Sequence, residues 1–309
     1  AEEAVTPHLD SLAEEGVRFA RAYTPVPLST PAHASVMTGA WPAEHGLHGT
    51  HGYAMNPDVA TLAEMLAEHG HACAGFAGGF PTNSRFGLGR GMDPYVVQLS
   101  PDQRRAVKNL EHPARAVASR AAAWIQQNGG QPFFCFINLH DPATPHESDR
   151  VERVEPEEAY REEISRVDTM IGALLRKLTE LDLREKTLVI VAGTHGEAFG
   201  EHDERGHGPL VYNTTLHVPL LMSLPGVLEE GKTDDRVASL VDIAPTVLAT
   251  VGADRSDSVS GHDLLGTAPT DRHVYAESEY LSRRFDAKPV RCLVGSRWKY
   301  IDGGRPDES

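Results

Sequence analysis

The stretch Pro27-Leu28-Ser29-Thr30-Pro31-Ala32-His33-Ala34-Ser35-Val36-Met37-Thr38-Gly39 has the pattern of a helix whose first turn faces an anion. Ser29 or Thr30 would cap this helix, and Gly39 would end it. Pro31 fits the first turn, because the N–H that proline lacks has no helical partner there. Unpaired N–H groups and the positive end of the helix dipole would then lie beside the Ser29 hydroxyl, where a sulfate or phosphate ester could bind. A helix start without a ligand explains the stretch equally well, so other segments must decide.

Composition limits the class of protein. The 309 residues are 40% hydrophobic, enough for one large globular domain or a domain with a subdomain. A net charge of −15 argues against a nucleic-acid partner, because phosphates would be repelled. No segment reaches the roughly 18 apolar residues of a membrane helix, and the polar start 1–4 is not a signal peptide. Each of the three cysteines, Cys73, Cys135 and Cys292, lies in an apolar run and is predicted to be a core residue.

Hydrophobic periodicity predicts alternating helices and strands. Two runs are continuous and apolar, Phe133–Leu139 and Thr187–Ala192, and this pattern is typical of strands buried on both faces. We therefore expect an α/β fold with a doubly wound, mostly parallel sheet flanked by helices and a small C-terminal antiparallel β element. Further helices are expected at 7–16, 59–69, 101–127 (with a break at 112–113), 157–181 and 241–251, and further strands at 17–23, 71–77, 219–223, 273–276, 290–294 and 297–301. Residues 41–56 are expected to form a loop.

Polar segments follow both apolar strands, at the sheet edge where α/β proteins bind ligands. Asn138, His140 and Asp141 follow the first strand, and the glycine-rich segment 193–208 follows the second. In that segment His195 and His207 could bind a divalent metal or donate hydrogen bonds to ester oxygens. Glu197 could hydrogen-bond a ligating histidine. His45, His48 and His51 fit loop residues better than a metal triad, and the segment 275–280 offers either an acidic contact at the rim or solvated glutamates.

The order of these segments resembles that of the sulfatase family of the alkaline-phosphatase superfamily, especially its bacterial sulfatase-like hydrolases. Ser29–Gly39 is similar to the family's Cys/Ser-x-Pro-x-Arg-Ala-Ser-x-x-Thr-Gly, with His33 in place of Arg. Four other stretches are similar to family motifs and keep the family's order: Thr6-Pro7-His8-Leu9-Asp10-Ser11-Leu12-Ala13, His45-Gly46, Thr194-His195-Gly196-Glu197 and Ser239-Leu240-Val241-Asp242-Ile243-Ala244-Pro245-Thr246. The resemblance covers nearly the whole chain.

The resemblance implies roles for individual residues. Ser29 stands where the family carries the residue oxidised to formylglycine, or a hydroxyl nucleophile in phosphate-cleaving relatives, with His33 and His207 as further catalytic residues. It also implies one divalent metal ion, Ca²⁺ or Mg²⁺ with Zn²⁺ or Mn²⁺ as alternatives. The implied metal positions are Ser29, Thr194 and His195, and the implied substrate contacts are Thr30, Asn138, His140 and Asp141.

Three departures from the family pattern concern the metal. The family's first strand, which carries acidic ligands before the Thr-Pro-Asn-Leu segment, is absent because the sequence starts at Ala1. Thr194 replaces the aspartate of Asp-His-Gly-Glu. Where close relatives have His-x-x-Asp-Pro-His, this chain has Asn138 and Ala143 at the histidine positions. Hard cations depend on several oxygen ligands, so the metal site is expected to be depleted.

Two functional hypotheses follow. The first is a hydrolase that cleaves sulfate esters, or phosphate or phosphonate esters, of a small molecule or glycan. The second is a sulfatase-fold protein that binds an anionic ligand or partner without turnover. We expect residues 1–285 to form the main domain and 286–309 to begin a small β subdomain. The sequence is compatible with either the cytoplasm or the periplasm as the compartment, because the N-terminal strand is missing. It does not predict an oligomeric state.

Overall fold

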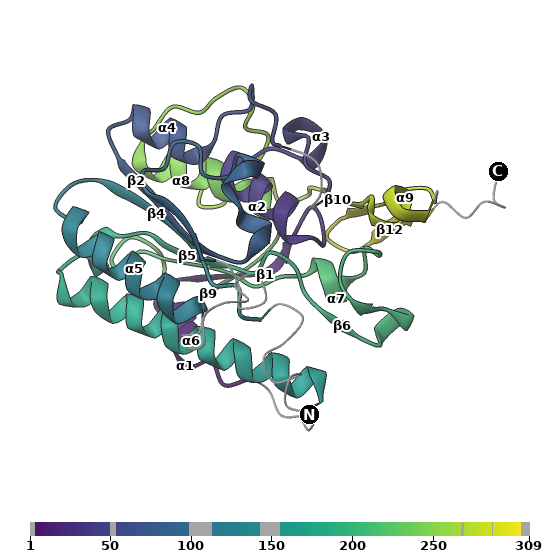
Figure 1. Cartoon of the computed structure of the whole chain (residues 1–309), viewed down its shortest axis with the longest axis horizontal. Helices are drawn as coiled ribbons and strands as arrows, with labels where there is room; N and C mark the ends of the chain where they lie inside the picture. Colours follow the sequence, from purple (N-terminus) through teal and green to yellow (C-terminus); the bar gives the residue numbers. More distant parts are fainter. Residues whose placement is uncertain are drawn as a thin grey trace, which may run out of the picture.

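The computed structural model is a layered α/β protein (Figure 1). It describes residues 4–49, 54–98, 113–142, 155–266, 269–285 and 287–303. The predicted helical segment 101–112, His51 and Ala143 lie outside these ranges. Cys73, Cys135 and Cys292 are free thiols, and the first and last of them are buried.

Two sheets form the middle layer. The first has the strand order β5-β8-β1-β9, and in it β8 runs antiparallel to both neighbours while β1 and β9 are parallel. The second is parallel and has the order β3-β2-β4. Their bounds are β1 (Val17–Tyr23), β2 (Ala72–Gly78), β3 (Tyr95–Gln98), β4 (Phe133–Asn138), β5 (Val189–Ala192), β8 (Leu220–Ser223) and β9 (Lys232–Ser239).

Helices cover both faces of this layer (Figure 1). One group contains α1 (Pro7–Glu14), α5 (Pro113–Asn128) and α6 (Pro156–Glu180), and the other contains α2 (Ser29–Thr38), α4 (Leu62–Glu68) and α8 (Ile243–Val251). The segment expected as a plain loop includes the short helix α3 (Pro42–His45), and α7 (Asn213–Leu216) is equally short. No helix in the described part of the chain has the length and apolar character that crossing a bilayer requires.

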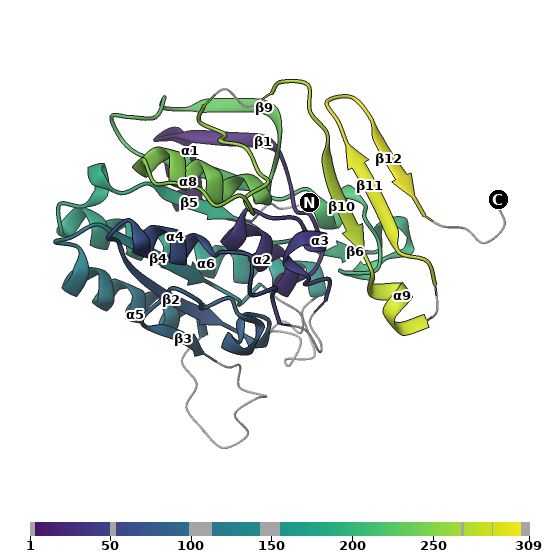
Figure 2. The same cartoon turned by 90° about the horizontal axis from the view of Figure 1, so that it is seen from above.

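The C-terminal element is a separate antiparallel sheet, whose three strands lie side by side next to the main layer in Figure 2. Its strands are β10 (Val274–Ser278), β11 (Val290–Val294) and β12 (Lys299–Asp302), with α9 (Tyr280–Phe285) after β10. Val290, Cys292 and Val294 alternate with exposed residues and point into a core shared with Tyr23. The predicted antiparallel β element is therefore confirmed.

The expectation that β4 and β5 are buried on both faces is wrong. Every residue of both strands is only half-buried. In the described structure β4 ends one sheet and β5 ends the other, so each strand pairs with a neighbour along one edge only. Their apolar composition indicated strands correctly but could not indicate their place in the sheet.

Packing explains where α1 and α2 lie. Asp168 of α6 is buried, and its carboxylate accepts the backbone N–H groups of His8 and Leu9 at 3.1 and 2.8 Å, which fixes the start of α1. Helix α2 ends at Gly39, whose φ is +66°. The Gly39 carbonyl accepts the N–H groups of Ser260 and Gly261 at 2.8 and 3.1 Å. The C-terminal end of α2 is thus anchored, and its N-terminal end carries the candidate site.

Candidate active site

Ser29 is the first residue of α2, and its side chain does not cap the helix. The N-cap position is Leu28, without a side-chain cap bond, which corrects the predicted capping by Ser29 or Thr30. The Ser29 Oγ instead lies 2.9 Å from Nε2 of His195, because the loop after β5 brings that imidazole to the helix start. Thr30 donates its hydroxyl to the carbonyl of Pro81 at 2.9 Å and so joins α2 to the neighbouring loop.

Backbone contacts fix the tautomer of His195. Its Nδ1 lies 3.0 Å from the carbonyl of Gly196, which can only accept, so Nδ1 carries the proton. Nε2 is then the acceptor, and the Ser29 hydroxyl donates to it. Burial lowers the pKa of His195 to about 3, with a further contribution from the nearby His207, so the imidazole is neutral at pH 7. Ser29 therefore faces a neutral nitrogen base.

His33 and His140 extend this group of imidazoles. His33 is buried one helical turn after Ser29 and donates Nδ1–H to the Ser29 carbonyl at 2.6 Å. Burial lowers the pKa of His33, against its hydrogen bonds to Ser29 and Asn138. Burial also lowers the pKa of His140 to about 4, and the nearby His33 and His207 add to this shift.

His140 can enter the site because Gly79 has no side chain. A Cβ at Gly79, whose φ is +79°, would lie 2.2 Å from Cδ2 of His140. The Asn138 amide donates to the carbonyl of Gly78 at 2.9 Å, which holds the ends of β2 and β4 together. These contacts place Asn138 and His140 beside His33, as expected for strand ends of one sheet.

Glu197 holds His207 against His195. The Nδ1 of His207 lies 2.7 Å from a carboxylate oxygen of Glu197, and the His207 ring stacks on the His195 ring with centroids 4.0 Å apart. Donor atoms of His195, Glu197 and His207 all lie within 4.8 Å of one another, so this group could hold a metal ion. The sequence predicts for Glu197 only the role of hydrogen-bonding a ligating histidine. Thr194, expected among the ligands, is half-buried and directly precedes His195.

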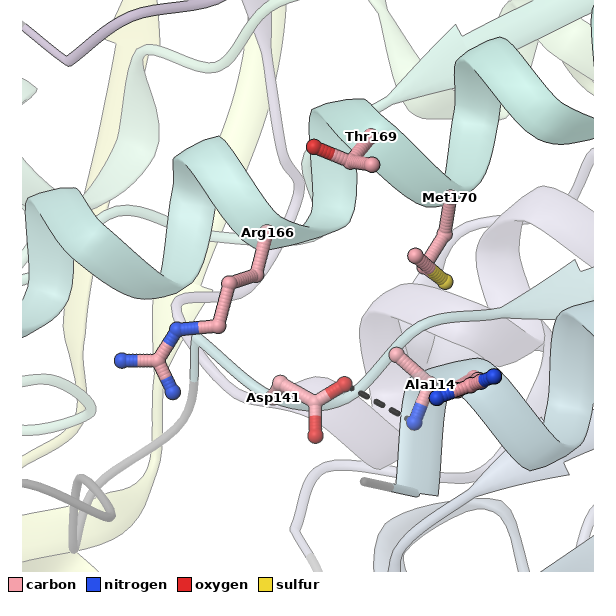
Figure 3. Close-up of a pocket in the computed structure, with 6 residues that line it drawn as sticks. Ala114, Asp141, Arg166, Thr169 and Met170 are labelled. Atoms are coloured by element: carbon pink, nitrogen blue, oxygen red, sulfur yellow. Dashed lines mark hydrogen bonds between the residues drawn. The ribbon is translucent and has the colours of Figure 1, made fainter. Parts of the chain in front are cut away.

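Asp141 points to a different place from its neighbour His140. Its carboxylate accepts the Ala114 N–H at 2.8 Å, at the start of α5 (Figure 3). Together with Arg166, Thr169 and Met170 it lines a cavity of about 170 Å³ between α5 and α6. The predicted substrate contact through Asp141 remains a prediction, and the observed contact of this residue is at the helix terminus.

The C-terminal sheet forms the rim of the site. The sequence predicts a contact at the rim only for the segment 275–280. Ser278 at the end of β10 donates its hydroxyl to the carbonyl of Gly208. A Cβ at Gly208 would lie 2.9 Å from Leu28 and 3.2 Å from the Tyr280 ring. The residues just before Ser29 and just after His207 therefore meet the first residue of α9.

Comparison with known proteins identifies the class. The sulfatase family model matches residues 2–253, so the chain belongs to the sulfatase family. Members of this family generally use a metal ion and a formylglycine. The chain is 23% identical over 375 residues to an ulvan-active sulfatase of Formosa agariphila, covering 98% of this chain and 58% of that protein. It is 23% identical to human arylsulfatase K over 84% of this chain and 61% of that protein. The chain thus spans about three fifths of the length of these relatives.

Solved structures show the same fold. The structure of Ps i-CgsB in complex with k-i-k-neocarrahexaose has a TM-score of 0.81 at 19% identity, covering 98% of this chain and 79% of that one. The phosphonate monoester hydrolase SpPMH from Silicibacter pomeroyi has a TM-score of 0.76 at 19% identity, covering 98% and 83%. The predicted sulfatase-like fold is confirmed, and the structural neighbours include a phosphonate monoester hydrolase and a 2-O GAG sulfatase.

Proposed function

We propose that this protein hydrolyses sulfate esters of a small molecule or glycan, with Ser29, or a formylglycine formed from it, as the nucleophile. The observation that carries the proposal is the 2.9 Å contact between Ser29 Oγ and Nε2 of His195 at the start of α2. A serine hydroxyl is a weak nucleophile unless a base or a metal activates it. Here the base is positioned, and its Nδ1–H bond to the Gly196 carbonyl leaves the lone pair on the side of Ser29.

The surrounding residues fit an anionic ester. The N–H groups in the first turn of α2 attract negative charge, as at any helix N-terminus. His207 has its Nδ1 held by Glu197 at 2.7 Å, which orients the ring, and Nε2 can donate to an ester oxygen when the ring is in its imidazolium form. We assign Asn138 and His140 to the same oxygens, because both lie at the strand ends that face α2.

The donor set of His195, Glu197 and His207 also fits one divalent metal ion. An ion bound to Nε2 of His195 would take the lone pair that otherwise accepts the Ser29 proton, so metal binding and base catalysis by His195 are alternative roles of this nitrogen. Two imidazoles and a carboxylate suit Zn²⁺ or Mn²⁺ better than Ca²⁺, which prefers six to eight oxygen ligands. A bound cation would polarise the ester oxygen and offset the charge that develops during bond cleavage. We therefore propose Zn²⁺ or Mn²⁺ before Ca²⁺ or Mg²⁺ for the residues that the structure describes.

A second candidate, hydrolysis of phosphate or phosphonate monoesters, is favoured by the serine itself. When Ser29 remains unmodified, its Oγ can attack phosphorus while the proton passes to Nε2 of His195. The P–O bond to the leaving group breaks as His195 returns this proton to the departing oxygen, and water then cleaves the Oγ–P bond to regenerate Ser29. The likeness to phosphonate monoester hydrolases shows the shared fold, which both activities use. Mass spectrometry of the peptide around Ser29 shows whether a formylglycine is present, because an unmodified serine excludes formylglycine chemistry in that sample. The ratio of kcat/KM for an aryl sulfate to kcat/KM for an aryl phosphonate separates the two candidates.

The test is Ser29→Ala in the full-length protein, with Ser35→Ala as its matched control. Ser35 lies on the same helix and also contacts a histidine at 2.9 Å, Nε2 of His45. In that pair the polarity is reversed: Nδ1 of His45 accepts the N–H of Leu47, so Nε2–H donates to Ser35. Both variants lose a serine–histidine bond from α2, but only one loses a hydroxyl that faces a base.

We expect Ser29→Ala to lower kcat/KM for an aryl sulfate or aryl phosphonate at least about a hundredfold. Ser35→Ala should lower Tm and leave kcat/KM per folded molecule unchanged. Unchanged turnover in Ser29→Ala would refute the enzymatic proposal. Anion binding without turnover in the wild-type protein, combined with less than one bound metal ion per chain, would support the binding hypothesis instead.

A further inference from the structure

A second group of convergent ligand atoms lies beside the candidate active site, on the C-terminal sheet. Nδ1 of His48 lies 2.5 Å from Oε1 of Glu277 and 3.5 Å from Oε1 of Glu279. These three atoms all lie within 4.8 Å of one another. The group shares no residue with His195, Glu197 and His207, and it joins positions 229 residues apart in sequence.

Outer contacts orient both carboxylates toward the histidine. The Tyr275 hydroxyl donates to Oε2 of Glu277 at 2.6 Å, and Nε of Arg283 donates to Oε2 of Glu279 at 2.8 Å. Each carboxylate therefore uses its Oε2 atom for an anchoring donor and presents its Oε1 atom to the shared point. Ligands of metal ions in proteins are typically oriented in this way by a further hydrogen bond.

Burial makes an unshielded pair of carboxylates costly at this place. The side chain of Glu277 is 5% exposed, and those of His48 and Glu279 are 19% and 20% exposed. The Arg283 guanidinium pairs with Oε2 of Glu279, and the two Oε1 atoms that converge in this partly desolvated position are stabilised by a further positive charge between them. A proton on Nδ1 of His48 or a metal ion can supply that charge, and the exposed edges of His48 and Glu279 leave a way in for an ion.

We propose that His48, Glu277 and Glu279 bind a divalent transition-metal ion such as Zn²⁺, as a second site separate from the one at Ser29. One imidazole nitrogen and two carboxylate oxygens are ligands that Zn²⁺ accepts, with water completing the coordination. The ion would tie the loop after α3 to the end of β10. Ser278 lies between the two glutamates and bonds the carbonyl of Gly208, so the ion would also stabilise the rim of the candidate active site.

The test uses metal-free full-length protein titrated with Zn²⁺ at pH 7.5, with bound metal counted by elemental mass spectrometry after dialysis. To remove the other candidate site, the titration is done in a His207→Ala background. We expect one tightly bound Zn²⁺ in that background and its loss on adding Glu279→Gln or His48→Gln. The matched control is Glu201→Gln, an exposed glutamate that bonds the N–H of Phe199, and it should keep the bound Zn²⁺.

Folding of each variant is checked by circular dichroism and thermal unfolding. Zn²⁺ should raise Tm in the His207→Ala background and leave Tm unchanged once Glu279→Gln or His48→Gln is added. The proposal would be overturned if Glu279→Gln and His48→Gln left the stoichiometry and affinity of Zn²⁺ binding unchanged. The absence of bound Zn²⁺ in the His207→Ala background would overturn it too. Neither result depends on ester hydrolysis, so failure of this proposal is distinct from failure of the proposed function.

Discussion

Asp242, in the motif Leu-Val-Asp-Ile, forms a buried ion pair whose strength can be measured. Its side chain is fully buried, and its two oxygens accept Nη1 and Nη2 of Arg272 at 2.9 and 3.1 Å. The same carboxylate accepts the backbone N–H groups of Ser239 and His262 at 2.7 and 2.9 Å. Four hydrogen bonds on one buried carboxylate join the end of β9, the start of α8 and the segment before β10.

The expected cost of breaking this pair follows from what is left behind. Asp242→Ala leaves the Arg272 guanidinium, 8% exposed, without its counter-charge, and Arg272→Met leaves the Asp242 carboxylate with two backbone donors only. Removing one partner of a buried pair costs about 3–5 kcal/mol. The double variant leaves no buried charge, only the two backbone N–H groups, at about 1–3 kcal/mol each. We therefore expect the double variant to cost about 4 kcal/mol less than the sum of the singles.

Urea denaturation of the wild type, both single variants and the double variant measures this coupling energy, provided that the slope m stays constant. A double variant that matches the sum of the singles within about 0.5 kcal/mol would refute the reasoning. Because Asp242 lies beneath α2 and away from Ser29, the kcat/KM of the folded fraction should not change. Loss of activity in fully folded Asp242→Ala would show that the ion pair supports the site directly.

Three further predictions test other elements. Asp168→Ala should destabilise the protein by about 2–3 kcal/mol in urea, because the first N–H groups of α1 lose a buried charged acceptor; a change below about 0.5 kcal/mol would contradict that role. Glu197→Gln should lower kcat/KM about 10- to 100-fold by releasing His207, and unchanged kinetics would mean that His207 is oriented without it. Burial depresses the pKa of His45 from 6.5 to about 3, so the unfolded state binds a proton that the folded state does not, and stability should fall as the pH drops from 6.5 toward 3. His45→Gln should reduce this slope, measured by urea denaturation, by about 1.4 kcal/mol per pH unit.

The sequence predicts the elements well where a local pattern determines them. Helix α2 ends at its C-cap Gly39, and the C-terminal strands β11 and β12 pair as a hairpin, as their residues predict. Strand β9 was missed, because Lys232-Thr233-Asp234-Asp235-Arg236 is polar and charged and lacks the apolar pattern of a strand. Its parallel pairing with β1 supplies the stabilising contacts, and those come from distant residues.

The site residues were found mainly through their position at strand ends. Ser29, His33, Asn138 and His140 come together because parallel strands end at one edge and α2 starts there. The contribution of His48 and Glu277 could not be found in this way, because their contact depends on how the C-terminal sheet packs beside the loop after α3. Proximity between positions so far apart in sequence leaves no local pattern in either segment.

The two serine–histidine pairs of α2 show why residue types alone do not define a catalytic pair. Ser29 with His195 and Ser35 with His45 have the same side chains and the same 2.9 Å contact. The difference lies in the backbone partner of Nδ1. In His195, Nδ1–H donates to the carbonyl of Gly196, whereas in His45, Nδ1 accepts the N–H of Leu47. Only the first arrangement leaves a base facing a hydroxyl. The proposed chemistry of this site therefore rests on the direction of a hydrogen bond that the fold, and not the motif, determines.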